Sequence, residues 1–373
     1  MTNKFDVCIS GGSMVGGTLA LLLAQQRLRV GWVSGESPAQ DVRAYSLNAR
    51  SRALLESVRC WPSPEHATPI ERMQVRGDDG GEIQFDAPSH ESLAWVVDVG
   101  VLQKQLLQAI EFQSNIQKIE KPESAPLTVI CEGKNSITRQ ELGVEYETLP
   151  YAQTAISARL LSSLPHQQIA HQWFVQNENQ ELEILALLPM GGMHGKELSL
   201  IWSVPTQKAS SLISISDEEF ISKIQQISQQ VGAVLQLHSK RVTWPLHLSH
   251  AKQWCGLAPN GAAWALAGDA AHTIHPLAGL GLNVGLADVQ ILADVLKTRD
   301  AHNYWRPIGD RHLLRQYERT CKAHLMPTWI ACDGLQRLFA HPHRLAQTAR
   351  NWGLNGLNQA PLLKQWLTTK AMQ

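Results

Sequence analysis

The residues with the clearest chemical potential form a glycine-rich string near the N-terminus, Gly11-Gly12-Ser13-Met14-Val15-Gly16. It follows the apolar run 5–9 and precedes the apolar segment 17–25, as expected of a turn between a strand and a helix. Glycines at such a turn let the backbone approach a pyrophosphate, and the free N–H groups of a helix N-terminus favour its phosphates. The string therefore predicts a dinucleotide site, although a packing turn without a ligand would use the same residues.

Two serines modify this dinucleotide pattern. Ser13 stands at the middle glycine position, where its hydroxyl could either crowd a pyrophosphate or donate a hydrogen bond to it. The next apolar run, 29–33, ends in Ser34, where the pattern expects an acidic residue that holds a ribose hydroxyl. Ser34 can make one such hydrogen bond, and Glu36 lies two residues further on.

A second candidate string begins where the apolar run 263–267 ends, at Gly268-Asp269, and continues to Asn283. A carboxylate at a strand end can accept a hydrogen bond from a ribityl hydroxyl. A glycine-rich helix start, here Gly279 to Asn283, can stabilise negative charge on a flavin ring. The alternative is a helix-capping aspartate followed by a turn. The length and order of the string favour a flavin site.

The elements that must position these strings follow from hydrophobic periodicity. The first run, helix and second run predict a parallel strand pair with a right-handed crossover. Between 151 and 250, β-like runs predict a mainly β layer that could hold a substrate. We expect strands at 73–76, 82–85, 127–131, 154–160, 182–188 and 198–203. We expect helices at 51–58, 100–111, 217–231 and 281–296, and a largely helical segment 310–373 that Pro327 punctuates.

Composition excludes several classes of protein. The 33 basic and 33 acidic residues balance, so nucleic-acid binding is not expected. The six cysteines form no CxxC pair, which argues against a zinc site or a disulfide framework and for a reducing compartment. No signal-like N-terminus and no run of about 18 apolar residues is present, so we predict a cytoplasmic protein. His272 and His275 are interpreted as packing residues rather than acid–base groups.

The string GDAAHTIHPLAGLGLN, which begins at Gly268, closely resembles the flavin-binding signature of single-component FAD aromatic-ring hydroxylases. Within that family it is most similar to the ubiquinone-biosynthesis hydroxylases. DVRAYSL (from Asp41), YAQTAI (from Tyr151) and DGLQRLF (from Asp333) are similar to further family segments, so the resemblance covers almost the whole chain. The flavin string is highly specific, and the other segments are supportive.

This resemblance implies an α/β fold with a Rossmann-like FAD-binding domain on a parallel sheet, a mainly β substrate domain and C-terminal helices. The implied FAD-binding domain comprises 1–68, 98–150 and 255–310. The substrate domain comprises 69–97 and 151–254, and the helical region comprises 311–373.

The resemblance also implies a monooxygenase in which NAD(P)H reduces FAD and dioxygen then hydroxylates an aromatic ring, with a polyprenylated phenol of ubiquinone biosynthesis as the expected substrate. Arg43 would reach the flavin or pyrophosphate, and Asp269 would hold the ribityl chain. The implied cofactor-binding residues are Gly11, Gly12, Ser13, Gly16, Ser34, Arg43, Gly268, Asp269, Pro276, Gly279, Gly281, Leu282 and Asn283. No catalytic residue and no metal ligand is assigned. A quinone-biosynthesis assembly is one expected association. The tail 360–367 could form an amphipathic helix that contacts the inner membrane peripherally, although a helix that docks on the protein is the favoured interpretation.

Several positions depart from the family pattern and keep other functions open. The departures are Ser13, Ser34, Gly100, Glu132 in place of an aspartate, Leu280 in place of a glutamine, and the short segment 112–126 where relatives place a β-meander. One alternative is a non-catalytic relative that serves as a scaffold or lipid-binding partner in a quinone-biosynthesis complex. Another is a flavoprotein with dehydrogenase or halogenase-like chemistry.

Overall fold

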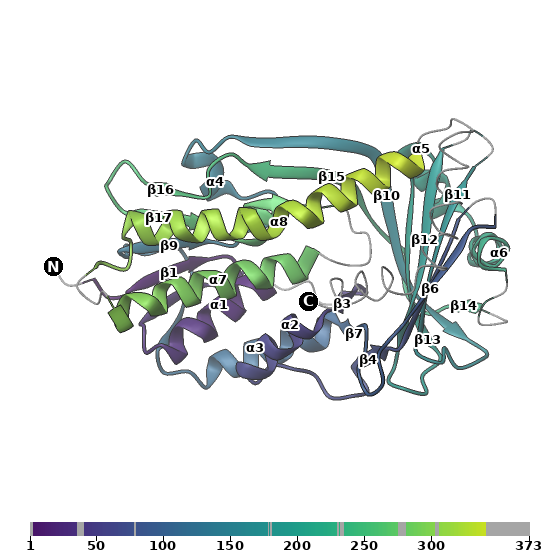
Figure 1. The fold of residues 1–373 in the computed structure, drawn as a ribbon, viewed down its shortest axis with the longest axis horizontal. Helices are drawn as coiled ribbons and strands as arrows, with labels where there is room; N and C mark the ends of the chain where they lie inside the picture. Colours follow the sequence, from purple (N-terminus) through teal and green to yellow (C-terminus); the bar gives the residue numbers. More distant parts are fainter. Residues whose placement is uncertain are drawn as a thin grey trace.

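The computed structural model describes residues 3–35, 41–77, 80–177, 179, 181–229, 231, 235–274, 281–302 and 306–340. A mostly parallel sheet with its helices lies at one end of the molecule, and a large, mainly antiparallel sheet lies at the other (Figure 1). The long strand β10 (Tyr146–Ser162) runs from one end toward the other. The predicted α/β class, with a parallel sheet and a separate β layer, is confirmed.

The N-terminal unit has the predicted crossover. Strand β1 (Val7–Ser10) pairs in parallel with β2 (Val30–Val33), and helix α1 (Met14–Gln25) connects them. Nearly all of α1 is buried, which explains why its sequence is apolar on every side. The six-stranded sheet has the order β16-β17-β9-β1-β2-β8. Its other strands are β16 (Cys255–Leu257), β17 (Ala263–Leu266), β9 (Leu127–Ile130) and β8 (Ile116–Ile119).

A layer of helices covers this sheet. Helix α1 packs against α3 (Val99–Glu111) and α7 (Gly281–His302), and α7 packs against α8 (Arg311–Ala340) (Figure 1). The expected break at Pro327 is wrong, because α8 continues through it. A proline inside a helix removes one backbone hydrogen bond and bends the axis. Pro327 is exposed, so water can satisfy the carbonyl that it leaves free.

The second sheet has the order β18-β15-β10-β13-β12-β11-β5-β6, with β14 paired to β10. Pairing with both β13 and β15 extends β10 well beyond the predicted 154–160. Helices α5 (Thr206–Ser214) and α6 (Asp217–Ser228) pack on the side of the sheet that carries Trp202. The remaining strands are β18 (His272–Thr273), β15 (Val242–Ala251), β13 (Glu197–Pro205), β12 (Leu182–Met190), β11 (Ile169–Gln176), β5 (Arg72–Arg76), β6 (Glu82–Asp86) and β14 (Leu235–Leu237).

A small third sheet and three short elements complete the described fold. The sheet has the order β3-β7-β4, formed by β3 (Ala44–Leu47), β7 (Ala94–Asp98) and β4 (Ala67–Ile70). Helix α2 (Ala49–Ser57) follows β3, helix α4 (Ile137–Glu141) follows β9, and the single-turn helix η1 (Gly268–Ala270) follows β17. In the part of the chain that the structure describes, no helix is long and apolar enough to cross a membrane.

Candidate cofactor site

The candidate strings meet because parallel strands end at the same edge of a sheet. The Gly11 N–H donates to the Val33 carbonyl at 3.2 Å, which joins the ends of β1 and β2. The Ala267 N–H donates to the Ile130 carbonyl at 3.0 Å, which joins the ends of β17 and β9. The N-terminal glycine string and the Gly268-Asp269 turn therefore lie at one edge, which is where α/β sheets bind ligands.

The glycines of the N-terminal string are required by backbone packing alone. Gly11 has a φ of +126°, and a Cβ built there would lie 2.3 Å from the Cys131 carbonyl oxygen. A Cβ at Gly12 would lie 2.3 Å from the Gly35 nitrogen, and one at Gly16 would lie 2.3 Å from the Gly11 oxygen. The packing-turn interpretation thus holds for these glycines, and a ligand-binding role would be additional to it.

Ser13 is the N-cap of α1. Its hydroxyl accepts from the Gly16 N–H at 3.5 Å and donates to the Cys131 carbonyl at 3.2 Å. The hydroxyl is therefore engaged within the protein, and it takes one of the N–H groups that a phosphate would otherwise meet.

Ser34 presents an unused polar atom at the end of β2. Its hydroxyl oxygen is buried and has no hydrogen-bond partner among the described residues. A buried hydroxyl of this kind is ordinarily satisfied by protein, water or ligand. Its place at the edge of the sheet fits a hydrogen bond to a ribose hydroxyl. Glu36, the other candidate for that role, lies outside the described residues.

Asp269 lies in η1 with its side chain accessible to solvent. Desolvation nevertheless raises the pKa of its carboxyl, against the attraction of His272, Lys134, Arg43 and His247. The exposed carboxyl is therefore open to a ligand at this edge of the sheet. The cationic groups around it complement a diphosphate.

Arg43, one of the cationic groups near the Asp269 carboxyl, is bound by Asp41. Its Nε lies 2.9 Å from Asp41 Oδ1, and its Nη2 also donates to Asp41 Oδ2. Desolvation opposes the charge of Asp41, but the hydrogen bonds from Arg43 outweigh it and lower the pKa of Asp41. The Arg43 side chain remains 43% exposed, so part of its guanidinium is available to a ligand.

Two residues that sequence reasoning missed hold the Gly268–Thr273 turn. Arg139 Nη1 donates to the Ala270 carbonyl at 3.0 Å, although its side chain is buried without a carboxylate partner among the described residues. Its guanidinium lies 3.6 Å from the centre of the Tyr146 ring, and the Tyr146 hydroxyl donates to the Asp269 carbonyl at 3.0 Å. In the sequence, the polar stretch that follows β9 was the feature that could have indicated a role for Arg139.

His272 and Asp288 form a buried ion pair behind the same turn. His272 Nε2 lies 2.6 Å from Asp288 Oδ2, and both side chains are at most 3% exposed. Asp288 Oδ2 also accepts from the Gly268 N–H at 2.9 Å, and the His272 ring stacks on Trp254. His272 therefore packs and positions the turn, as interpreted from sequence. Asp288 was missed, and its signal was an acid among apolar residues in the first half of α7. His275 lies outside the described residues.

The start of α7 uses its asparagine internally. Asn283 Oδ1 accepts from the Asn48 N–H at 2.9 Å and from the Ser51 hydroxyl at 2.8 Å, and its Nδ2 donates to the Ser46 carbonyl at 2.7 Å. Its amide thus fixes α7 to β3 and α2, which leaves its backbone and one Nδ2 hydrogen outside this contact. Leu282 is buried, whereas Gly281 has open space beside its Cα. Pro276, Gly279 and Leu280 lie outside the described residues.

Glu132, which stands in place of the family's aspartate, is saturated with hydrogen bonds. It accepts from the hydroxyls of Ser10 (2.5 Å), Ser136 (2.7 Å) and Thr138 (2.6 Å), and from the Thr138 N–H (3.1 Å). Desolvation opposes its charge, but these bonds outweigh it and lower the pKa of Glu132. The longer side chain therefore has a structural use in this chain.

Replacing Glu132 by aspartate is expected to lower the free energy of unfolding by about 1–3 kcal/mol, because the shorter carboxylate cannot reach all four donors. Urea unfolding at neutral pH would measure this change, with the exposed Glu141→Asp in α4 as control. The contribution is present above the ordinary pKa of 4.5 and is lost as pH falls through the lowered value. Equal stability of the two variants would contradict this account of Glu132.

A mostly parallel sheet with a glycine turn at its edge, joined to a large antiparallel sheet, defines a two-sheet α/β nucleotide-binding protein. The family model described as FAD binding domain matches residues 112–328, more than half of the chain. The chain belongs to this FAD-binding family.

Similar proteins span nearly the full length of the chain. It is 27% identical to the mitochondrial ubiquinone biosynthesis monooxygenase COQ6 of Drosophila melanogaster, over 100% of this chain and 90% of that protein. It is 28% identical to the 3-demethoxyubiquinol 3-hydroxylase of Escherichia coli, over 98% of each chain. The crystal structure of p-nitrophenol 4-monooxygenase PnpA from Pseudomonas putida has the same fold, with a TM-score of 0.75 at 14% identity over 100% of this chain and 99% of that one.

These findings confirm the resemblance predicted from sequence and FAD as the cofactor, and they support an enzyme. Which residues contact FAD, and where one domain ends and the next begins, stay predictions.

Proposed function

We propose that this protein is an FAD-dependent monooxygenase that hydroxylates an aromatic ring, with a polyprenylated phenol of ubiquinone biosynthesis as substrate and NAD(P)H as reductant. The observation that carries the proposal is full-length similarity to two proteins named as hydroxylases or monooxygenases of that pathway. The site supports it, because the Ser34 hydroxyl, which has no partner among the described residues, and the exposed Asp269 carboxyl lie at the edge where α/β sheets bind ligands.

The residues present fit FAD. Ser34 would accept or donate one hydrogen bond at the adenosine ribose, and Asp269 would hold the ribityl chain. Arg43 and Lys134 would face the diphosphate, whose charge they complement. FAD, when bound, supplies the redox chemistry that amino-acid side chains lack. The protein's part is to orient the cofactor through a turn that Arg139, Tyr146 and Asp288 hold rigid.

The first test is the visible absorbance spectrum of freshly purified protein, before and after addition of FAD. We expect the bands of oxidised flavin, retained after gel filtration. We then expect NAD(P)H oxidation to depend on a polyprenylated phenol in detergent micelles. The product should carry one oxygen atom from labelled dioxygen. A protein that stays colourless in excess FAD would contradict the proposal.

The structure also favours one alternative, a non-catalytic relative that acts as a scaffold or lipid-binding partner. Ser13 and Glu132 depart from the family pattern, and both are used for internal hydrogen bonds. Such a protein would support quinone synthesis in cells without binding FAD. A third function, dehydrogenase or halogenase-like chemistry, would be indicated by substrate-dependent NAD(P)H oxidation without a hydroxylated product.

A further inference from the structure

The zero net charge of the chain hides a strong asymmetry. Residues 311–373 contain nine Lys or Arg and two Asp or Glu, so this segment carries seven net positive charges. The first 310 residues carry seven net negative charges in compensation. A basic segment on an otherwise acidic protein indicates an anionic partner.

Helix α8 shows how the first part of this charge is arranged. Arg311, Arg315 and Arg319 are exposed and follow one another at four-residue spacing, so they form a row along one face. The opposite face, with Leu314 and Tyr317, is buried in the core. Among the described residues, no carboxylate forms an ion pair with any of the three arginines. Within the part of the chain that the structure describes, this row is therefore positive charge without a compensating carboxylate.

The only acid in this part of α8 is already neutralised. Glu318 Oε1 accepts from Lys322 Nζ at 2.6 Å and from the Trp254 N–H at 3.2 Å. Its other oxygen accepts from the Cys255 thiol at 3.4 Å, and burial is the main cause that raises the pKa of Cys255 to about 12. The thiol is thus uncharged at neutral pH, and Glu318 adds little repulsion toward an anion.

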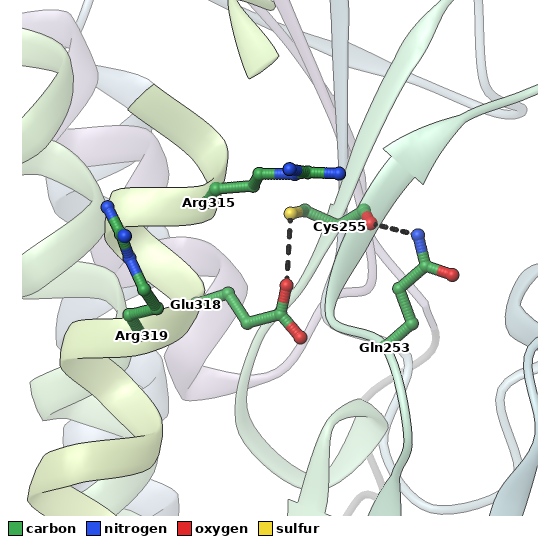
Figure 2. A pocket seen from close by; sticks show the side chains of 5 residues that line it. All are labelled: Gln253, Cys255, Arg315, Glu318 and Arg319. Atoms are coloured by element: carbon green, nitrogen blue, oxygen red, sulfur yellow. Dashed lines mark hydrogen bonds between the residues drawn. The ribbon is translucent and has the colours of Figure 1, made fainter. Parts of the chain in front are cut away.

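A cavity of about 380 Å³ opens beside the arginine row, between α8 and β16 (Figure 2). Arg315 reaches over Cys255, and Glu318 closes the side of the cavity below it (Figure 2). The residues that line the cavity are Gln253, Cys255, Arg315, Glu318 and Arg319. Guanidinium groups bind phosphate oxygens in pairs of parallel hydrogen bonds, so the two arginines at its rim, which form no ion pair with a described carboxylate, suit a phosphodiester.

We propose that this face of α8 docks on the surface of an anionic phospholipid bilayer, with the cavity between α8 and β16 receiving a headgroup phosphate. The binding depends on charge and needs no turnover. The reason for docking rests on the proposed function, because a polyprenylated phenol resides in the bilayer and the enzyme must reach it there. The apolar face of α8 is packed in the protein core, so its exposed arginines would hold the protein at the lipid surface by charge alone, at about 1 kcal/mol for each cation.

The test compares vesicles of phosphatidylcholine with vesicles of phosphatidylcholine mixed with phosphatidylglycerol, in a flotation assay with the full-length protein. We expect binding only to the mixed vesicles, and weaker binding at high salt. Arg315→Ala/Arg319→Ala should lower the partition coefficient about fivefold for each arginine removed. The matched control is Lys104→Ala/Lys118→Ala, which removes two exposed charges from α3 and from β8, the strand at the opposite edge of the sheet from β16. This control should bind as the parent does.

Three outcomes would overturn the proposal. The first is that the protein does not bind the mixed vesicles. The second is that the arginine and lysine variants lose vesicle binding equally. The third is that Arg315 and Arg319 bind inorganic phosphate while the protein does not bind vesicles. Flavin content and hydroxylation of substrate in detergent micelles are measured on the same preparations. A protein that binds FAD but not vesicles would refute membrane docking and leave the proposed function standing. A protein that binds vesicles but not FAD would refute the proposed function and leave membrane docking standing.

Discussion

Asp269→Ala is expected to weaken FAD binding by about thirtyfold or more, which corresponds to the loss of about 2 kcal/mol or more for one partner of a desolvated charged hydrogen bond. The effect is expected because Asp269 is exposed at the edge of the sheet where the cofactor is proposed to bind, and alanine offers no acceptor to a ribityl hydroxyl. Fluorescence titration of the apoprotein with FAD would measure the dissociation constant. Asp269→Asn should fall between alanine and the parent, since the amide still offers an oxygen acceptor.

The matched control is Asp294→Ala, which removes an exposed carboxylate from α7 and should leave FAD affinity unchanged. Urea unfolding of the two apoproteins would show whether the Asp269 variant is folded. Unchanged FAD affinity in Asp269→Ala would remove this residue from the cofactor site. If the variant loses FAD but still restores quinone synthesis in cells that lack their own hydroxylase, the non-catalytic alternative would be preferred.

Asp288→Ala is expected to lower the free energy of unfolding by about 3–5 kcal/mol, the usual result of removing one partner of a buried ion pair. The substitution would leave the His272 imidazole and the Gly268 N–H buried without their acceptor. Urea unfolding with and without FAD would measure the loss. The double variant His272→Ala/Asp288→Ala should lose less than the sum of the two single variants, because the two groups interact directly. Additive losses would contradict the pairing.

The same pair predicts a pH dependence of stability. Burial disfavours the imidazolium of His272, but the charge and hydrogen bond of Asp288 outweigh it and raise the pKa of His272 above 6.5. The stabilisation by the pair is therefore complete below pH 6.5 and is lost as pH rises through the raised pKa. Urea midpoints across this range should decline in the parent protein and decline less in Asp288→Ala. The same slope in both proteins would assign the pH dependence to another group.

Local sequence determined much of this protein. The apolar run, glycine turn and apolar helix of β1 and α1 have periods and turn residues that do not depend on distant partners, so this crossover was predictable. The flavin string from Gly268 was recognisable because its order of residues is specific, and it identified the family. The edge of the sheet where these segments meet followed from the parallel order of the strands.

Tertiary structure decided how the individual polar residues are used. Ser13 bonds to Cys131, Asn283 bonds to residues near position 48, and Arg139 bonds to Ala270. These partners are more than a hundred residues apart in sequence, so no local pattern contains them. Each buried polar group takes whichever partner the packed chain places within hydrogen-bond distance, because leaving it unpaired costs free energy. Sequence could therefore name the residues at this edge, but only the fold separated those that hold the turn from those left free for a ligand.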